Sequence, residues 1–151
     1  MEEYSIILKR HSLKVTPQRV AILEYLMSSY SHPTAEVIFS DLMKVYPSMS
    51  LATVYKTLDT LRSEGIILEI NTGEDSNRYD SNTSQHAHSI CLGCNTVTDI
   101  KLPHILENID SEMFLSHGFS VLDKRMFFYG YCQGCKDKQS AGEEYASIAV
   151  K

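Results

Sequence analysis

The sequence predicts an α+β chain with a mainly helical first part and a second part in which strands and a helix alternate. Three observations predict this class. Apolar residues recur at helical spacing in three successive runs before Gly65, two strand-like runs flank a turn after it, and strand-like runs resume beyond residue 84. With 151 residues and 43% hydrophobic content, the chain can fill one core or two small ones.

The helices of the first part have recognisable starts. Residues 4 to 10 give only a weak helical signal. Each of the three stronger runs follows a hydroxyl residue, whose oxygen can accept a hydrogen bond from the first turn of the helix. The start and end signals are Thr16 before Pro17, Thr34 with an end at Pro47, and Ser50 with an end at Gly65.

One side of each of these helices is expected to be buried. The apolar positions are Val20, Ile22, Leu23, Leu26 and Met27 in the first run, Val37, Ile38, Leu42 and Val45 in the second, and Leu51, Val54, Leu58 and Leu61 in the third. On the third helix, the residues expected to face outward are Thr53, Tyr55, Lys56, Thr57 and Thr60.

A β-hairpin is predicted directly after the helices. Ile66 to Ile70 is strand-like, Asn71 to Gly73 is typical of a turn, and Ser76 to Tyr79 is typical of the returning strand. Helices followed by a hairpin are typical of a winged helix-turn-helix DNA-binding domain, which we place at residues 1–79. The alternative is a small helical subdomain with an ordinary solvated face. The residues expected to contact DNA are Arg19, Ser50, Thr53, Tyr55, Lys56 and Thr57.

Charge is distributed unevenly along the chain. The whole chain has a net charge of −5, which argues weakly against non-specific binding to nucleic acid. Residues 9 to 62, however, contain seven Lys or Arg and only four Asp or Glu. The predicted DNA-binding part is therefore locally positive. The acidic start at Met1 to Tyr4 and the absence of a long apolar run predict a cytoplasmic protein with no membrane partner.

The polar residues 80–84 are suited to a hinge, and residues 85–151 are expected to form a second, α/β dimerisation and metal-binding domain. Its predicted elements are strands at His88 to Cys91 and Val97 to Ile100, a helix at Pro103 to Ser116, and a long β-segment from Phe119 to Tyr131. No function is assigned to the tail, residues 136–151. An aromatic-rich strand is easily completed by a second copy, so a homodimer is expected.

All four cysteines occur in two Cys-x-x-Cys pairs, Cys91 with Cys94 and Cys132 with Cys135. Each pair can turn two thiolates toward one ion, so the two pairs predict a closed tetrahedral site for a structural Zn²⁺. A redox dithiol is an alternative, although that chemistry uses one such pair at the start of a helix. Two disulfides are a third possibility, favoured only in an oxidising compartment.

A second group of candidate metal ligands carries nitrogen and oxygen. His86 and His88 are two residues apart on one strand, with Asp80 before them and Asp99 after them. His32 lies far away in the first part and would join them only if the two parts came together. Three imidazoles and two carboxylates suit Fe²⁺, Mn²⁺ or Zn²⁺ and leave a sixth position open. Each residue alone is more simply a surface histidine or a capping aspartate.

Taken together, these motifs resemble the ferric uptake regulator family over residues 5 to 138. The segments that carry the resemblance are His32-Pro33-Thr34-Ala35-Glu36, Ser50 to Tyr55, Arg78-Tyr79-Asp80, His86 to Cys94 and Tyr129 to Cys135. The resemblance implies a dimeric, metal-responsive transcriptional repressor that is not an enzyme and binds a palindromic double-stranded DNA operator.

Within that family the chain is most similar to the peroxide-sensing branch. The resemblance implies a regulatory Fe²⁺ or Mn²⁺ site at His32, Asp80, His86, His88 and Asp99, where iron sensors usually carry Glu at the last position. It also implies that H₂O₂ reacts at the bound Fe²⁺ and oxidises His32 or His86, which releases repression. The alternatives are an iron- or zinc-responsive regulator of the same family and, in another class, a metalloenzyme that uses the His/Asp site.

Overall fold

The computed structural model describes residues 2–29, 31–72 and 77–139, and the chain divides into two units, Met1–Thr83 and Ser84–Lys151. The first unit is helical and ends in a two-stranded hairpin. Within its described residues, the second contains a three-stranded sheet and two helices. The α+β class predicted from the sequence is therefore confirmed. Asp80, expected at the start of a hinge, is the last residue of a strand in the first unit.

Four helices form most of the first unit: α1 (Glu2–Arg10), α2 (Pro17–Ser28), α3 (Ala35–Leu42) and α4 (Leu51–Ser63). All three predicted caps are confirmed. The side-chain oxygens of Thr16, Thr34 and Ser50 accept hydrogen bonds from the backbone N–H three residues ahead, at 3.3, 3.4 and 3.1 Å. These local bonds fix where each helix begins.

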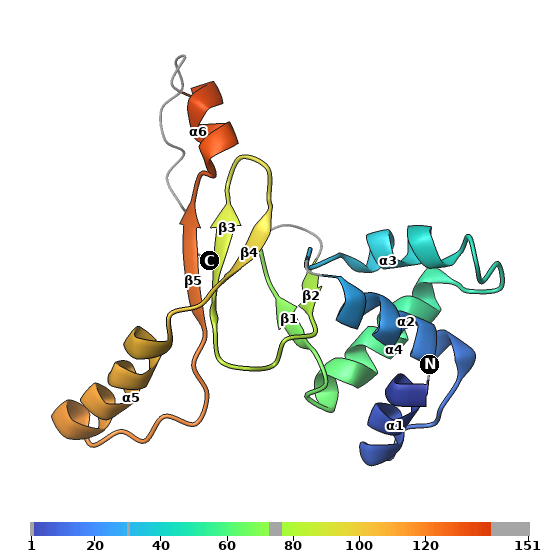
Figure 1. The fold of residues 1–151 in the computed structure, drawn as a ribbon, viewed down its shortest axis with the longest axis horizontal. Coiled ribbons are helices and arrows are strands. Elements are labelled where there is room, and N and C mark those ends of the chain that lie inside the picture. Colours follow the sequence, from blue (N-terminus) through green and yellow to red (C-terminus); the bar gives the residue numbers. More distant parts are fainter. Residues whose placement is uncertain (1, 30, 73–76, 140–151) are drawn as a thin grey trace. The chain divides into compact units, whose positions relative to one another are not determined.

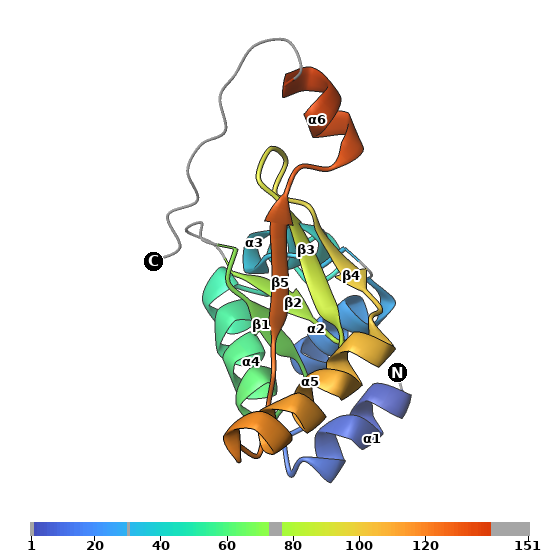
Figure 2. The same cartoon turned by 90° about the vertical axis from the view of Figure 1, so that its left-hand side faces the viewer.

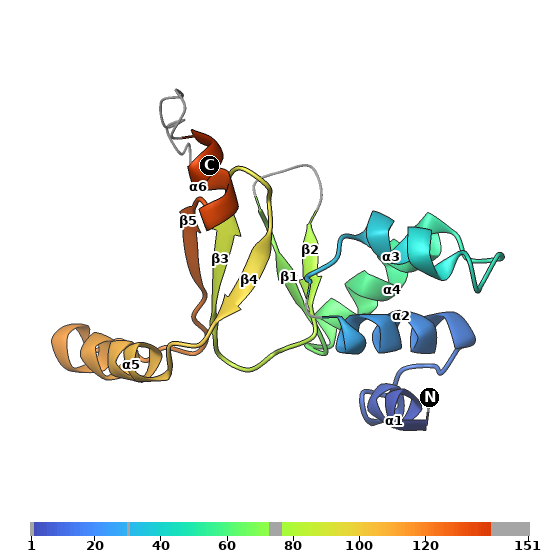
Figure 3. The same cartoon turned by 45° about the horizontal axis from the view of Figure 1, so that its top comes forward.

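The helices pack around one core. Helix α2 contacts α1, α3 and α4, and α3 also packs on α4 (Figures 1 and 3). Burial of these apolar side chains is the main source of stability for the unit. The fully enclosed core side chains are Leu8, Ile22, Leu23, Leu26, Ile38, Val54, Leu58, Leu61 and Ile67.

The expected apolar side of α3 was partly wrong. Ile38 is buried, but Val37 and Val45 are exposed. Helix α3 ends at Leu42, before Val45, and its buried stripe begins at Ala35. Residues three and four apart share a helix face, so Ala35 and Ile38 define a stripe from which Val37 points away.

The hairpin consists of β1 (Leu68–Ile70) and β2 (Arg78–Asp80), which pair antiparallel with Leu68 opposite Asp80 and Ile70 opposite Arg78. The predicted strands are confirmed but shorter, because Ile66 and Ile67 enter the core before β1 begins. Residues 73–76, which include parts of the predicted turn and returning strand, lie outside the described residues.

In the second unit, β3 (Ala87–Cys91) lies between β4 (Val97–Ile100) and β5 (Met126–Gly130), as Figure 2 shows. Strand β3 runs antiparallel to β4 and parallel to β5. Helix α5 (Pro103–His117) connects β4 to β5, and α6 (Gln133–Gln139) follows β5. The strand order makes β5 an edge strand among the residues described.

The long β-segment predicted from Phe119 to Tyr131 was wrong in its first half. Helix α5 ends at His117, the next residue Gly118 has the left-handed φ of 62° typical of a helix end, and the strand begins only at Met126. Phe119 and Leu122 are exposed instead of alternating into a core. Residues 140–151 of the predicted tail lie outside the described residues, while residues 136–139 belong to α6.

Candidate functional site

The four cysteines meet at one end of the sheet of the second unit. Cys91 ends β3, Cys94 follows in the turn to β4, and Cys132 and Cys135 flank the start of α6. All four are free thiols, and their sulfur atoms lie within 4.8 Å of one another. Cys94 Sγ and Cys132 Sγ are 3.8 Å apart. A tetrahedron with Zn–S bonds of about 2.3 Å has edges of about 3.8 Å, so this sulfur set fits Zn²⁺.

The backbone around the cysteines holds this arrangement. Asn95 has a left-handed φ of 57°, and its N–H donates to the Cys91 carbonyl at 2.8 Å, which closes the first turn. At the second pair, the Cys135 N–H donates to the Cys132 carbonyl at 3.0 Å. Gly93 lies against the second pair, because a Cβ on Gly93 would stand 2.9 Å from Cys135 Cβ.

Hydrogen bonds and burial give the thiols different acidities. Burial alone raises the pKa of Cys91, but backbone groups of Cys132, Cys94 and Gly93 outweigh it and lower that pKa to about 6. The Thr96 hydroxyl, whose oxygen is 3.1 Å from Cys94 Sγ, lowers the pKa of Cys94. Metal binding requires deprotonated sulfur, so both residues of the first pair are prepared as thiolate ligands.

The predicted redox alternative is less consistent with the second pair. Cys132 and Cys135 do lie at the start of a helix, where redox dithiols occur. However, the sulfur atoms of all four cysteines lie within 4.8 Å of one another, whereas exchange chemistry uses one pair. The neighbouring thiols, with Cys132 as the largest contributor, raise the pKa of Cys135 to about 12, and a coordinated cation would overcome this by binding the thiolate. The fourfold cluster therefore favours a metal over exchange chemistry at this pair.

His86, His88 and Asp99 also converge within the second unit. His88 and Asp99 are direct partners across β3 and β4. The Nε2 atoms of His86 and His88 are 2.9 Å apart, and Asp99 Oδ1 is 3.3 Å from the first and 3.6 Å from the second. Bonds of about 2.1 Å give edges of about 3.0 Å in an octahedron and about 3.4 Å in a tetrahedron. The three atoms are spaced as ligands of one ion would be.

One contact fixes which nitrogen of His86 faces this cluster. His86 Nδ1 is 2.8 Å from the Ser84 carbonyl oxygen, which can only accept, so Nδ1 carries the proton. In the neutral ring, Nε2 then keeps its lone pair for a ligand. His88 is held by stacking on Phe127 of β5, with ring centroids 5.7 Å apart.

His32 and Asp80 form the part of the predicted site that belongs to the first unit. Both are buried, and His32 Nε2 is 3.8 Å from Asp80 Oδ2. They are brought together although 48 residues separate them in the sequence, because the loop before α3 is joined to β2. The predicted ligands therefore form two groups, a pair in one unit and a triad in the other.

Arg78 is a residue of this region whose role the sequence did not reveal. Its Nη1 donates to the His32 carbonyl at 3.1 Å, and its backbone forms an isolated bridge with Thr34. The Tyr79 N–H donates to the Pro33 carbonyl at 3.1 Å. His32 itself has a left-handed φ of 48°, which costs free energy in a residue with a Cβ. These bonds hold His32 in that conformation.

Helix α4 exposes a different set of residues from the one expected. Thr57 is only 6% exposed, so the expectation that it faces outward was wrong. It lies three residues after Val54 and four before Leu61, and this spacing places it on the buried stripe. Lys56 is exposed and Thr53 is half-buried, with its hydroxyl 2.8 Å from that of Ser50.

The other residues expected to contact DNA have partners of their own. Arg19 lies in the first turn of α2 and donates through Nη1 to the Lys14 carbonyl at 2.6 Å. Tyr55 is exposed on α4 and donates its hydroxyl hydrogen to Glu36 of α3. Glu36 was not identified from the sequence as a functional residue, although it lies in the first of the motifs quoted for the family.

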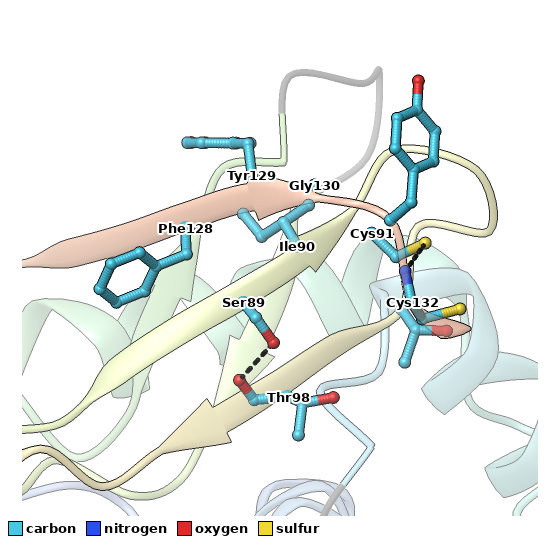
Figure 4. Close-up of a pocket in the computed structure, with 10 residues that line it drawn as sticks. Ser89, Ile90, Cys91, Thr98, Phe128, Tyr129, Gly130 and Cys132 are labelled. Atoms are coloured by element: carbon cyan, nitrogen blue, oxygen red, sulfur yellow. Dashed lines mark hydrogen bonds between the residues drawn. The ribbon is translucent and has the colours of Figure 1, made fainter. Parts of the chain in front are cut away.

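A pocket of about 190 Å³ lies on the second unit next to Cys91 and Cys132 (Figure 4). Ser89 and Thr98 line one part of it, and Phe128 and Tyr129 line another. Its lining includes no histidine or carboxylate, which are the usual general bases of hydrolases. The pocket therefore gives no support to the metalloenzyme alternative.

Known proteins similar to this chain are regulators of one family. The model of the family described as "Ferric uptake regulator family" matches residues 10–129. The peroxide operon regulator of Bacillus subtilis is 42% identical over 88% of this chain and 91% of its own length. The peroxide-responsive repressor PerR of Staphylococcus aureus is 39% identical over 91% of this chain and 93% of its own length.

Solved structures extend the likeness to the fold. The ferric uptake regulator Fur of Helicobacter pylori has a TM-score of 0.77 at 26% identity, with 89% of this chain and 90% of that chain covered. The Campylobacter jejuni peroxide stress regulator has a TM-score of 0.71 at 34% identity, with 85% and 96% covered. These relatives are regulators rather than enzymes. No helix among the described residues is long and apolar enough to cross a membrane. On the family match and these identities, the chain belongs to the ferric uptake regulator family.

Proposed function

We propose that this protein is a dimeric, metal-dependent transcriptional repressor that senses hydrogen peroxide by oxidation of a metal-binding histidine. Proteins of its family are dimeric DNA-binding regulators, and the two relatives at about 40% identity are a peroxide-responsive repressor and a peroxide operon regulator. The observation that carries the proposal is the division of the nitrogen and oxygen donors between the two units, with His32 and Asp80 in one and His86, His88 and Asp99 in the other.

In this proposal, Cys91, Cys94, Cys132 and Cys135 hold one structural Zn²⁺ in each chain. The sulfur spacing supports this role. Among the described residues of the second unit, few apolar side chains are buried, namely Ala87, Ile90, Cys91 and Val97. A small core of this kind requires another source of stability, which a closed zinc site supplies.

The regulatory site would use all five histidine and aspartate ligands for Fe²⁺ or Mn²⁺. An ion that binds the pair and the triad together favours conformers in which the two units are close. If DNA binds the same conformers better, metal affinity and DNA affinity rise together and by the same factor. Metal binding is thereby coupled to repression.

DNA recognition is assigned to the exposed side of α4 and its start. Ser50, Thr53, Tyr55 and Lys56 are the proposed contacts there, with Arg19 on α2 as a phosphate contact. Thr57 is withdrawn from this set because it is buried. In a dimer, two such helices would read two half-sites of a palindrome.

The proposed dimer surface belongs to the second unit. Strand β5 is an edge strand in the described sheet, and an edge offers unpaired backbone groups to a second chain. Large apolar side chains on β5 and in the preceding segment are also exposed, and a second chain could cover them. They are Phe114, Leu115, Phe119, Leu122, Phe128 and Tyr129.

The sensing reaction would take place on the protein's own imidazoles. Fe²⁺ held by these ligands would supply the redox chemistry that activates peroxide, and Mn²⁺ would supply it only slowly. In the net reaction, one imidazole C–H and one H₂O₂ give an oxidised ring carrying one more oxygen atom and one H₂O. His86 and His32 are the proposed sites of oxidation. An oxidised ring is a poorer ligand, so the metal and then the DNA are released.

The test is DNA retardation by purified protein loaded with Fe²⁺ or Mn²⁺, before and after H₂O₂. Metal-dependent binding that peroxide abolishes only in the Fe²⁺ form supports the proposal, as does a gain of one oxygen atom on the His32 or His86 peptide. Metal-dependent binding that peroxide leaves intact would instead identify an iron- or zinc-responsive regulator. Cysteine oxidation as the only change would place sensing at the thiols.

A further inference from the structure

The hydrogen bond between Tyr55 and Glu36 joins two helices of the first unit. Tyr55 lies on the exposed side of α4, and its hydroxyl donates to Oε1 of Glu36, which lies in the first turn of α3. The two residues are 19 positions apart in the sequence. The bond therefore depends on how α3 packs against α4, which is a contact of the unit's core.

The carboxylate end of this bond is itself held in place. Glu36 follows the Thr34 cap of α3, where the exposed N–H groups and the helix dipole favour a negative charge. The Tyr55 hydrogen bond lowers the pKa of Glu36, and Glu36 in turn raises the pKa of Tyr55. At neutral pH the pair is therefore a neutral phenol donating to a charged acceptor, which is a strong type of hydrogen bond.

The hydrogen bond to Glu36 restricts the rotamers of the Tyr55 side chain. Tyr55 is the large side chain on the exposed face of α4, with 42% of its surface accessible. A free side chain in that position would sample several rotamers and lose this freedom on binding a ligand, which weakens the binding. An anchored ring has lost that freedom in advance.

We propose that Glu36 is a positioning residue for DNA recognition. It accepts the hydrogen bond of the Tyr55 hydroxyl and thereby holds the Tyr55 ring in its binding orientation. The proposal rests on the proposed function, since it assigns the exposed side of α4 to DNA. It makes Tyr55 a residue that presents its ring to DNA, while its hydroxyl remains bonded to the protein.

Because Glu36 is negatively charged, the proposal can be tested by whether its removal strengthens or weakens DNA binding. DNA is a polyanion, so removing a carboxylate near the binding surface should by charge alone strengthen binding. Positioning predicts the reverse, because Glu36→Ala frees the Tyr55 ring. Asp59 provides a matched control, as an exposed carboxylate on α4 that pairs with Arg62 at 2.6 Å rather than with Tyr55.

The experiment measures affinity of the Mn²⁺-loaded protein for a duplex selected from a randomised DNA pool with wild-type protein. Glu36→Ala and Tyr55→Phe should each weaken binding by between about threefold and tenfold for each recognition helix. The double variant should be no weaker than either single one. Asp59→Asn should bind as wild type or more tightly, and Glu36→Gln, whose amide oxygen still accepts, should recover part of the affinity.

One readout separates positioning from a phosphate contact, and the choice of variant separates it from an effect on helix stability. The slope of log affinity against log salt should stay unchanged in Tyr55→Phe, because no phosphate contact is lost. Tyr55→Phe also keeps the cap of α3, so a change of helix stability does not enter its result. Equal or tighter binding by Glu36→Ala overturns the inference, as does weaker binding by Tyr55→Phe alone. A wild-type protein that selects no duplex overturns the proposed function and the role of Glu36 with it.

Discussion

His88 and Asp99 stand directly opposite each other in the antiparallel pair of β3 and β4, with Nε2 of His88 3.6 Å from Oδ1 of Asp99. Opposed residues in such a pair have a separation that the backbone fixes to within about 1 Å. The reach of the carboxylate therefore depends on side-chain length alone. Aspartate places its oxygen beside both histidine nitrogens, and a longer acid would shift it.

The first prediction follows from this geometry. Asp99→Glu should retain Fe²⁺-dependent DNA binding, since glutamate still offers a carboxylate, but should lose release by low concentrations of H₂O₂. The longer side chain alters how freely the open position admits peroxide. DNA retardation before and after H₂O₂, with mass spectrometry of the His32 and His86 peptides, measures both properties. Peroxide release with wild-type sensitivity in this variant would contradict the proposed role of Asp99.

The second prediction concerns the ligand in the first unit. His32→Ala should weaken metal-dependent DNA binding, because it leaves Asp80 as the only proposed ligand from that unit. Zinc content and the dimer should be unchanged, since the cysteines and β5 belong to the second unit. Metal analysis, size-exclusion chromatography and DNA retardation test the three parts separately. If the variant retains wild-type metal dependence, coupling through His32 is excluded.

Arg78 gives a third prediction, distinct from removal of a ligand. Arg78→Ala should lower the affinity for Mn²⁺ by about tenfold to 100-fold, the usual effect of losing a group that orients a metal ligand. The reason is that its guanidinium holds the His32 carbonyl and with it the left-handed turn. Isothermal titration with Mn²⁺ is the measurement. Arg62→Ala is the control, because the ion-pair partners of Arg62 are Asp59 and Glu69, and equal effects of both substitutions would refute the assignment.

The fourth prediction compares two glycines near the cysteine cluster. Gly93→Ala should destabilise the zinc site by about 1–3 kcal/mol, because its Cβ would stand 2.9 Å from Cys135 Cβ and 3.0 Å from Cys135 Sγ. Gly134→Ala should be tolerated, since a Cβ there meets nothing within 4 Å. The rate of zinc loss to a chelator measures the difference. Similar rates for the two variants would show that the contact at Gly93 is relieved at little cost.

The fifth prediction is a loss of stability at high pH. Burial, with a smaller contribution from Glu69, raises the pKa of Tyr79 to about 12. An unfolded tyrosine ionises near pH 10, so its contribution is complete below about pH 10 and disappears as pH rises toward 12. Two pKa units correspond to at most about 2–3 kcal/mol. Urea unfolding at pH 9 and pH 11 should show a smaller loss in Tyr79→Phe than in wild type, and equal losses would refute the prediction.

Much of the local structure followed from the sequence because its causes are local. Thr16, Thr34 and Ser50 cap helices through bonds that span three residues, so neighbouring residue types are sufficient to identify them. The two Cys-x-x-Cys pairs and the spacing of His86 and His88 are also short-range patterns. The sequence by itself therefore determined the types of most elements, the donor atoms available to a metal and the resemblance to a family.

The tertiary structure decided the relationships between distant segments. The register of β3 and β4 sets Asp99 against His88, and the bridge between Thr34 and Arg78 brings His32 to Asp80. Packing of α4 into the core buries Thr57, and packing of α3 on α4 gives Tyr55 its bond to Glu36. Each of these depends on which face of one element packs against which face of another. The helical or strand period of the sequence shows which residues share a face, but not which element that face contacts. The partner is chosen by the packing of the whole core.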